Sequence, residues 1–518
     1  MRRSGGVWWR DMGGVAFFNG LHSAQSVGVN WTGMGHAMND QPAQAPPNRK
    51  SHRLKTAIFF LVGFFALYLV YRYSLSSAIQ GRLDSIRRSG LPATCAELDK
   101  WYTEPPAGEN ASDVYHEAFA HYESWTNKPA RLSVASNATD RSKFSSPPRT
   151  RRDQLPTVGQ AKLPLRTEPL PAETRQLVAE YLSDNAEALQ LLHRASAMKS
   201  CRYPIDLNKG FATLLPHLNQ LRQAARLLSL EAMEQTEEQR PQEAVESVIA
   251  SLNVSRSLNQ EPMLISYLVH VACQGISLES LQRILNRMPL TDTQLSELAA
   301  AIEESENQQA LTRAFVGERC MGQSGFEELR TGKVPMKDMV SFLGEPPWWC
   351  HLFWLYRTTG LLELDERCYL DIMEENVKAT RLPPPEDMAA ASAVVGKVNH
   401  LSLCHVLSRM MLPALDQAVI KAGRCDAMIH NAQVAIAVEH FRLANATLPK
   451  QLSDLVPAFL SAVPSDPFDG KPLRYKTLAK GYVVYSVGDD REDNGGVEKN
   501  SKGVSWVPGT DITFTVER

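Results

Sequence analysis

An acidic, glycine-containing loop near the C-terminus has the residue types that best suit metal binding. From Asp489 to Gly496 its sequence is DDREDNGG. Calcium takes about six to eight oxygen ligands, which carboxylates and the carbonyls of a tight glycine turn supply. An EF-hand loop beginning at Asp490 fails at loop position 12, because Ser501 stands where a bidentate glutamate is required. The loop therefore predicts either a hard-cation site of another geometry or a solvated acidic turn.

Four further signals surround this loop: Leu-Pro at 448–449, Asp-Pro-Phe at 466–468, Gly-Tyr-Val-Val-Tyr-Ser-Val-Gly at 481–488, and Asp-Ile at 511–512. Together they resemble the globular end of the major pseudopilin of type II secretion systems, over roughly residues 412–518. The resemblance implies a long helix, a small antiparallel sheet and an acidic loop that holds calcium.

The resemblance also implies a set of metal ligands. Asp490 and Asp511 match the two carboxylates that flank the metal, and Val487 matches a carbonyl donor. Asp493 is an additional carboxylate of the same loop. The stretch between Gly496 and Asp511 is longer here than in the family pattern.

An uncharged apolar run near the N-terminus predicts a membrane helix. Residues 56–71 read TAIFFLVGFFALYLVY and lie between Lys55 and Arg72. The run is slightly short for a span of ~20 residues, but both flanking charges can extend toward the interface. A secretory signal peptide is the alternative, although the run is long for one and no clear cleavage motif follows. We predict an uncleaved single-pass helix over 56–79.

The flanks of this run predict its orientation. Tyrosines suited to an interfacial belt lie at its C-terminal end, at Tyr68, Tyr71 and Tyr73. Basic residues are denser on the N-terminal side, at Arg49, Lys50, Arg53 and Lys55. The positive-inside rule then favours a cytoplasmic N-terminus. We expect a protein of the cell inner membrane with the bulk of the chain in the periplasm.

The middle of the chain follows a helical period. Apolar residues recur on one helix face at Leu214, Leu218, Leu221, Ala225 and Leu228. Thr291 and Gln294 form a capping-box pattern that begins a later helix. Helix pairs with short turns resemble a tetratricopeptide (TPR) array, but its consensus of about 34 residues is absent. We predict an irregular helical bundle or short solenoid of TPR-like pairs.

The predicted fold is mainly α, ending in an α+β module. That module has a long helix over about 412–444 and strands over 473–476, 482–486 and 512–516. In order, the predicted segments are a non-native or disordered extension (1–37, with Met38 as the biological start), a cytoplasmic basic flank (38–55), the transmembrane helix (56–79), short helices (80–125), a basic flexible loop (126–170), a helical domain (171–411) and the pseudopilin-like domain (412–518). This layout, with Leu98-x-x-Trp-Tyr after the membrane helix, resembles large envelope proteins of planctomycete-type bacteria.

Composition narrows the function classes. Lys and Arg number 55 against 57 Asp and Glu, so the net charge of −2 argues against a general nucleic-acid binder. The eight cysteines lie singly, which favours buried small side chains or one or two disulfides. Ser196 and Lys199 fit an S-x-x-K pattern, but the companion motifs of that enzyme class are absent or out of order. Residues 342–357 are strongly aromatic and predict core packing or contact with a membrane surface or a partner.

These observations favour a membrane-anchored, exported binding or scaffold protein with a cation-stabilised tail and envelope protein partners. A secretion-system accessory component and an envelope hydrolase with a non-local active site are the alternatives. The assembly helix and processing site of a true pseudopilin are not contiguous with the tail, so assembly into a pseudopilus is not expected.

Overall fold

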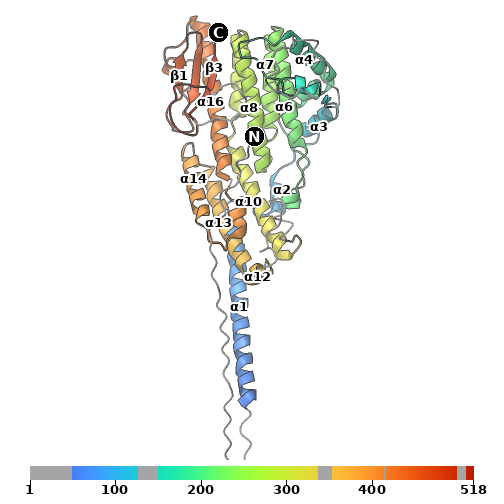
Figure 1. Ribbon diagram of the computed structural model, residues 1–518, viewed down its shortest axis with the longest axis vertical. Coiled ribbons are helices and arrows are strands. Elements are labelled where there is room, and N and C mark those ends of the chain that lie inside the picture. Colours follow the sequence, from blue (N-terminus) through green and yellow to red (C-terminus); the bar gives the residue numbers. More distant parts are fainter. Residues whose placement is uncertain (1–48, 127–149, 336–352, 414, 499–508) are drawn as a thin grey trace, which may run out of the picture. The chain divides into compact units, whose positions relative to one another are not determined.

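The computed structural model describes residues 49–126, 150–335, 353–413, 415–498 and 509–518 (Figure 1). The predicted extension 1–37, much of the basic loop and most of the aromatic segment lie outside these residues. The described chain is mainly helical with one small sheet, as predicted. It divides into two units, residues 1–67 and residues 68–518.

Helix α1 (Arg49–Arg88) changes character along its length. Its first half exposes almost every apolar side chain, and Phe59 is 75% exposed. From Leu75 onward the residues at helical spacing are buried, ending with Ile86 at 2% exposure. By length and composition the stretch from Leu54 qualifies as a candidate membrane span, and none of its most apolar window is buried. The predicted N-terminal membrane helix is therefore supported in part.

A bundle of long helices forms the centre of the second unit. Helices α6 (His217–Glu237), α7 (Pro241–Arg256) and α8 (Leu264–Arg287) pack against one another. Helix α8 also qualifies by composition as a span, but half of its most apolar window is buried, as in a core helix. Helix α9 (Asp292–Ser305) begins at the predicted capping box, because the Thr291 hydroxyl accepts from the Gln294 N–H at 3.3 Å.

The remaining helices pack against this bundle or against one another. On the N-terminal side they are α2 (Cys95–Trp101), α3 (Ala111–Ala120), α4 (Ala172–Asp184) and α5 (Ala186–Ser196), with 3-10 turns η1 (Arg152–Gln154) and η2 (Leu207–Ala212). On the C-terminal side they are α10 (Gln308–Thr331), α12 (Phe353–Thr358), α13 (Leu361–Ala379), α14 (Glu386–Asn399) and α15 (Val406–Met411). Residues 150–170, part of the predicted basic loop, bury Leu155, Val158 and Leu170, so this part packs against the protein rather than standing in solvent.

The C-terminal module matches the predicted elements closely. Helix α16 (Leu415–Asn445) and the 3-10 turn η5 (Leu452–Leu455) lead into strands β1 (Arg474–Thr477), β2 (Tyr482–Ser486) and β3 (Ile512–Val516). The sheet is antiparallel in the order β1-β2-β3, and every residue of the central strand β2 is buried.

A glycine fixes the turn before β2. Gly481 has φ +77°, and a Cβ there would lie 1.8 Å from the Val516 carbonyl oxygen. Only glycine fits, which explains the first residue of the Gly-Tyr-x-x-Tyr pattern.

The module shares one hydrophobic core with the helical body. Val484 and Phe514 of the sheet belong to the same buried cluster as Leu281 and Ile284 of α8 and Ile436 of α16. Asn286 Nδ2 on α8 also donates to the Thr515 carbonyl at 2.8 Å. The described residues of the module, 415–498 and 509–518, are therefore continuous with the helical body.

The described cysteines are all free thiols. Cys95, Cys273, Cys320 and Cys425 are buried, which agrees with small side chains that fill the core. Cys350 lies outside the described residues.

Candidate functional site

The acidic loop is tied to the long helix by its first residue. Arg424 on α16 donates from Nε to both carboxylate oxygens of Asp489, at 2.8 and 3.1 Å, and also from Nη2. The pair is part-buried, and a bidentate charge-assisted contact of this kind fixes direction as well as distance. It aligns the start of the loop with the helix that underlies the sheet.

The predicted ligands lie on two facing segments of this loop. Asp490 accepts from the Glu492 N–H at 3.1 Å and from the Gly509 N–H at 2.9 Å. Asp511 accepts from the Gly496 N–H at 2.7 Å and from the Asn494 N–H at 3.3 Å. Asp490 therefore bonds to a residue near Asp511, and Asp511 bonds back to residues that follow Asp490. These contacts tie the two segments together.

Asp493 and Val487 complete the predicted set. Asp493 accepts from the Tyr485 hydroxyl at 3.2 Å and lies 3.9 Å from Arg474 Nε. The Val487 side chain is buried, and its N–H donates to Asp466 at 2.9 Å. Burial, with nearby Asp493 as a further cause, raises the pKa of the Asp511 carboxyl.

The donor set fits a calcium ion in part. Carboxylate oxygens are the right chemistry, and each retains a lone pair beyond the N–H bond it accepts. No group of three or more His, Cys, Asp or Glu side chains arranged for a metal occurs in the described part of the chain. Asp490 and Asp511 would hold calcium together with loop carbonyls. The ion would supply positive charge that holds the two segments together.

A buried aspartate organises the module. Asp466 is fully buried, and it accepts from the Phe468 N–H, the Ser486 hydroxyl at 2.8 Å and the Val487 N–H. Arg474 Nη1 on β1 donates to the same carboxylate at 2.6 Å. Asp466 thus joins the Asp-Pro-Phe turn, both ends of the hairpin and the start of the acidic loop. Sequence reasoning used this residue only as part of a motif and assigned it no such role.

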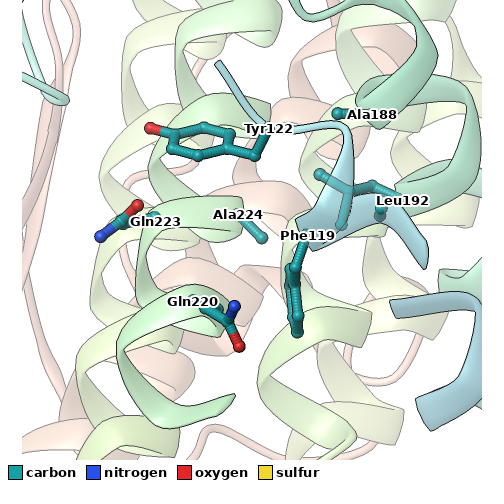
Figure 2. Close-up of a pocket in the computed structure, with 8 residues that line it drawn as sticks. Phe119, Tyr122, Ala188, Leu192, Gln220, Gln223 and Ala224 are labelled. Atoms are coloured by element: carbon teal, nitrogen blue, oxygen red, sulfur yellow. The ribbon is translucent and has the colours of Figure 1, made fainter. Parts of the chain in front are cut away.

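A small cavity lies among α3, α5 and α6. Figure 2 shows Tyr122 at the top of the view, Leu192 and Phe119 on the right, and Gln220 and Gln223 of α6 toward the left. Its volume is about 100 Å³, well below the ~300–1,000 Å³ of ligand sites. The Tyr122 hydroxyl is already paired with that of Tyr181 at 2.7 Å. This cavity is a packing space.

A much larger polar cleft forms where helix ends meet. Its volume is about 820 Å³, within the range of ligand sites. Its walls are residues 103–106 between α2 and α3, residues 196–201 after α5, and the ends of α7, α9 and α10. Most of these segments are far apart in the sequence, and the S-x-x-K pattern at 196–199 is the local motif singled out above that falls among them.

Four amide side chains and an ion pair are among the residues that line the cleft. The amides are Asn253, Asn259, Gln260 and Asn307. Arg256 Nη1 donates to Glu304 at 2.6 Å and to Asn253 Oδ1 at 2.8 Å. Asn259 is 9% exposed, and its Oδ1 has no hydrogen-bond partner among the described residues. This oxygen atom is itself buried, and a buried acceptor without a partner costs ~1–3 kcal/mol.

A buried polar network supports the cleft floor. Ser257 lines the cleft and bonds the Tyr203 hydroxyl at 2.8 Å. The Tyr203 ring stacks on His217 at 4.2 Å, and His217 Nε2 lies 3.0 Å from Glu261 Oε2. His217 is 2% exposed, so this network holds the floor rigid rather than meeting a ligand.

The nucleophilic side chains of the cleft are not arranged for catalysis. Ser196 donates its hydroxyl to the His193 carbonyl at 2.9 Å, and Lys199 is exposed. Burial raises the pKa of the Cys201 thiol to about 12. The S-x-x-K spacing therefore does not give an activated serine here.

Comparison with known families, with characterised proteins and with solved structures finds no match for this chain. The pseudopilin and envelope-protein resemblances accordingly rest on the quoted residues alone.

Proposed function

We propose that this protein is a single-pass, membrane-anchored binding protein of the cell envelope, with an exported helical body that holds a polar ligand in the cleft between its helix ends. The cleft of about 820 Å³ is the observation that carries the proposal. The exposed apolar half of α1 is the anchor, with the N-terminus in the cytoplasm and the body in the periplasm. TPR-like helix pairs would suit such a body, because stacked helix pairs create extended concave binding surfaces.

The chemistry of the cleft favours a peptide ligand. Asn and Gln side chains donate and accept hydrogen bonds at once, as main-chain amides do. Four such side chains, with Arg256 and Glu304 at one wall, match an extended peptide carrying both backbone amides and charged groups. The proposed ligand is therefore an extended segment of another envelope protein.

The tail serves as a rigid, cation-stabilised support in this proposal. Calcium at Asp490 and Asp511, with Val487 and Asp493 nearby, would fix the acidic loop against the sheet. The pseudopilin resemblance supports this role, and it also supports a second function as an accessory component that docks on secretion machinery through the tail.

Selection of short random peptides against the full chain in nanodiscs tests the binding proposal. Ala197 lines the cleft and is exposed, so Ala197→Trp fills the cleft without disturbing the core. Ala179 is also exposed, on α4 outside the cleft, and Ala179→Trp is the matched control. Enriched peptides are expected to bind Ala197→Trp at least about tenfold more weakly, a loss of ~1.4 kcal/mol.

The control variant should bind those peptides like the parent protein. Equal binding by Ala197→Trp, or failure to enrich any peptide on the parent protein, would overturn the proposal.

A further inference from the structure

Helix α12 is held against the part of α1 where the apolar run ends. The Tyr68 hydroxyl donates to the Thr358 carbonyl at 2.6 Å, and Arg72 Nη1 donates to the Arg357 carbonyl at 2.6 Å. Arg72 also pairs with Glu363, the third residue of α13. Tyr68 and Arg72 are one helical turn apart, about 6 Å along the axis. Two successive turns of α1 therefore fix the C-terminal end of α12.

The turn after α12 packs on the same face of α1. Gly360 has φ +85°, and a Cβ there would meet Leu75 Cδ1 at 2.8 Å and Tyr71 Cε1 at 3.0 Å. A larger residue would push α12 away from α1. The position of α12 beside Tyr68–Leu75 is therefore built into the backbone.

A second segment is tied to α12 from the other side. The Tyr356 hydroxyl donates to Asp365 at 2.6 Å and lies 2.9 Å from the Cys404 carbonyl. Asp365 in turn accepts from the Leu407 N–H at 2.7 Å. Residues 401–405 therefore lie next to α12.

These two segments expose large apolar side chains. Trp354 is 60% exposed, Leu355 is 39% exposed and Leu403 is 79% exposed. Arg357 on α12 is exposed beside them. Tryptophan with nearby arginine is the composition of a membrane–water interface, where the indole ring lies at headgroup depth and the cation meets lipid phosphate.

We propose that α12 and residues 401–405 form a second membrane contact, which inserts into the interfacial layer of the same bilayer that α1 spans. The inference rests on the anchor in the proposed function. Arg72 ends the uncharged run and must lie near headgroup depth, and α12 is bonded to Arg72 and Tyr68. Trp354 and Leu403 then lie at the same depth. This contact fixes the tilt of the body on the membrane, which a single helix alone would leave free.

Quenching by brominated lipids tests the contact in the full chain. The protein is reconstituted in phosphatidylcholine vesicles with or without bromine on the upper acyl chain. In each lipid, the fluorescence emission of the Trp354→Phe variant is subtracted from that of the parent protein. The difference is the emission of Trp354. Bromine is expected to quench this difference by about half or more, because an interfacial indole lies at the depth of the label.

Trp101→Phe is the matched control, since Trp101 lies on α2 with Arg313 over its ring at 4.7 Å. Its emission should be the same in both lipids. Leu403→Glu alters only an exposed side chain and is expected to reduce the quenching of Trp354 about twofold. Equal Trp354 emission in both lipids would overturn the membrane contact, and would show that protein covers this surface instead.

Extraction with alkaline carbonate separates this result from a failure of the anchor. Protein that stays in the vesicles while Trp354 is unquenched overturns the second contact alone. Protein that is extracted overturns the anchor, and the membrane contact with it.

Discussion

Replacement of Asp466 by alanine should destabilise the C-terminal module and make it open more often. The carboxylate is fully buried and accepts from two backbone N–H groups, the Ser486 hydroxyl and Arg474. Hydrogen bonds to a charged group contribute ~1.5–3 kcal/mol each, and breaking a buried pair from one side costs ~3–5 kcal/mol. Because these contributions overlap, we expect a loss of about 3–5 kcal/mol for the module.

Hydrogen exchange of the β2 amides in the full chain measures this loss directly, since local opening does not require a two-state unfolding of the whole protein. A loss of ~3–5 kcal/mol accelerates exchange of residues 482–486 about a hundredfold or more. Asp466→Asn keeps the shape but removes the charge, and should give an intermediate effect.

Asp469→Ala is the matched control. Asp469 also pairs with Arg474, but Arg474 would keep Asp466 as a partner. We expect a cost of about 1 kcal/mol for this partly exposed pair. If Asp466→Ala accelerated hydrogen exchange of the β2 amides no more than Asp469→Ala does, the hydrogen bonds of Asp466 would not be the main stabilising contacts of the module.

Two further predictions concern calcium and pH. Calcium at about a hundred times its dissociation constant should stabilise the protein by ~2.7 kcal/mol, measured as a higher melting temperature in calcium than in chelator. The double variant Asp490→Asn/Asp511→Asn should abolish that shift. Identical melting temperatures in calcium and in chelator would show that the tail holds no calcium. Burial, then neighbouring Glu238, raises the pKa of Glu234 to about 7. The folded state therefore holds a proton that the unfolded state has lost between about pH 4.5 and 7, so stability falls as pH rises through that window and levels off above it. Glu234→Gln should accordingly stabilise the protein by roughly 1–3 kcal/mol at pH 8 and by nothing at pH 4 in chemical denaturation; an equal effect at both pH values would contradict the assigned pKa.

The elements of the tail were predictable because their signals are local. Strands 482–486 and 512–516 were predicted at their observed bounds from apolar residues and flanking turn residues. The capping box at Thr291 was also predicted, since a cap involves residues only three apart. The buried half of α1 was harder to predict. Nothing in the sequence of residues 56–79 marks the position at which the side chains of this helix change from exposed to buried against the rest of the protein.

The sequence by itself determined which segments are helices and strands, which stretch is apolar enough to span a membrane, and where acidic side chains gather. Periodicity, turn residues and composition act over a few residues, so they can be read along the chain. Only the tertiary structure decided that Asp466 and Arg474 anchor the module, that Tyr68 and Arg72 hold α12, and that four separate stretches of the chain enclose a cleft. Such contacts join residues up to 290 positions apart. They depend on how helices pack, and no local pattern encodes that.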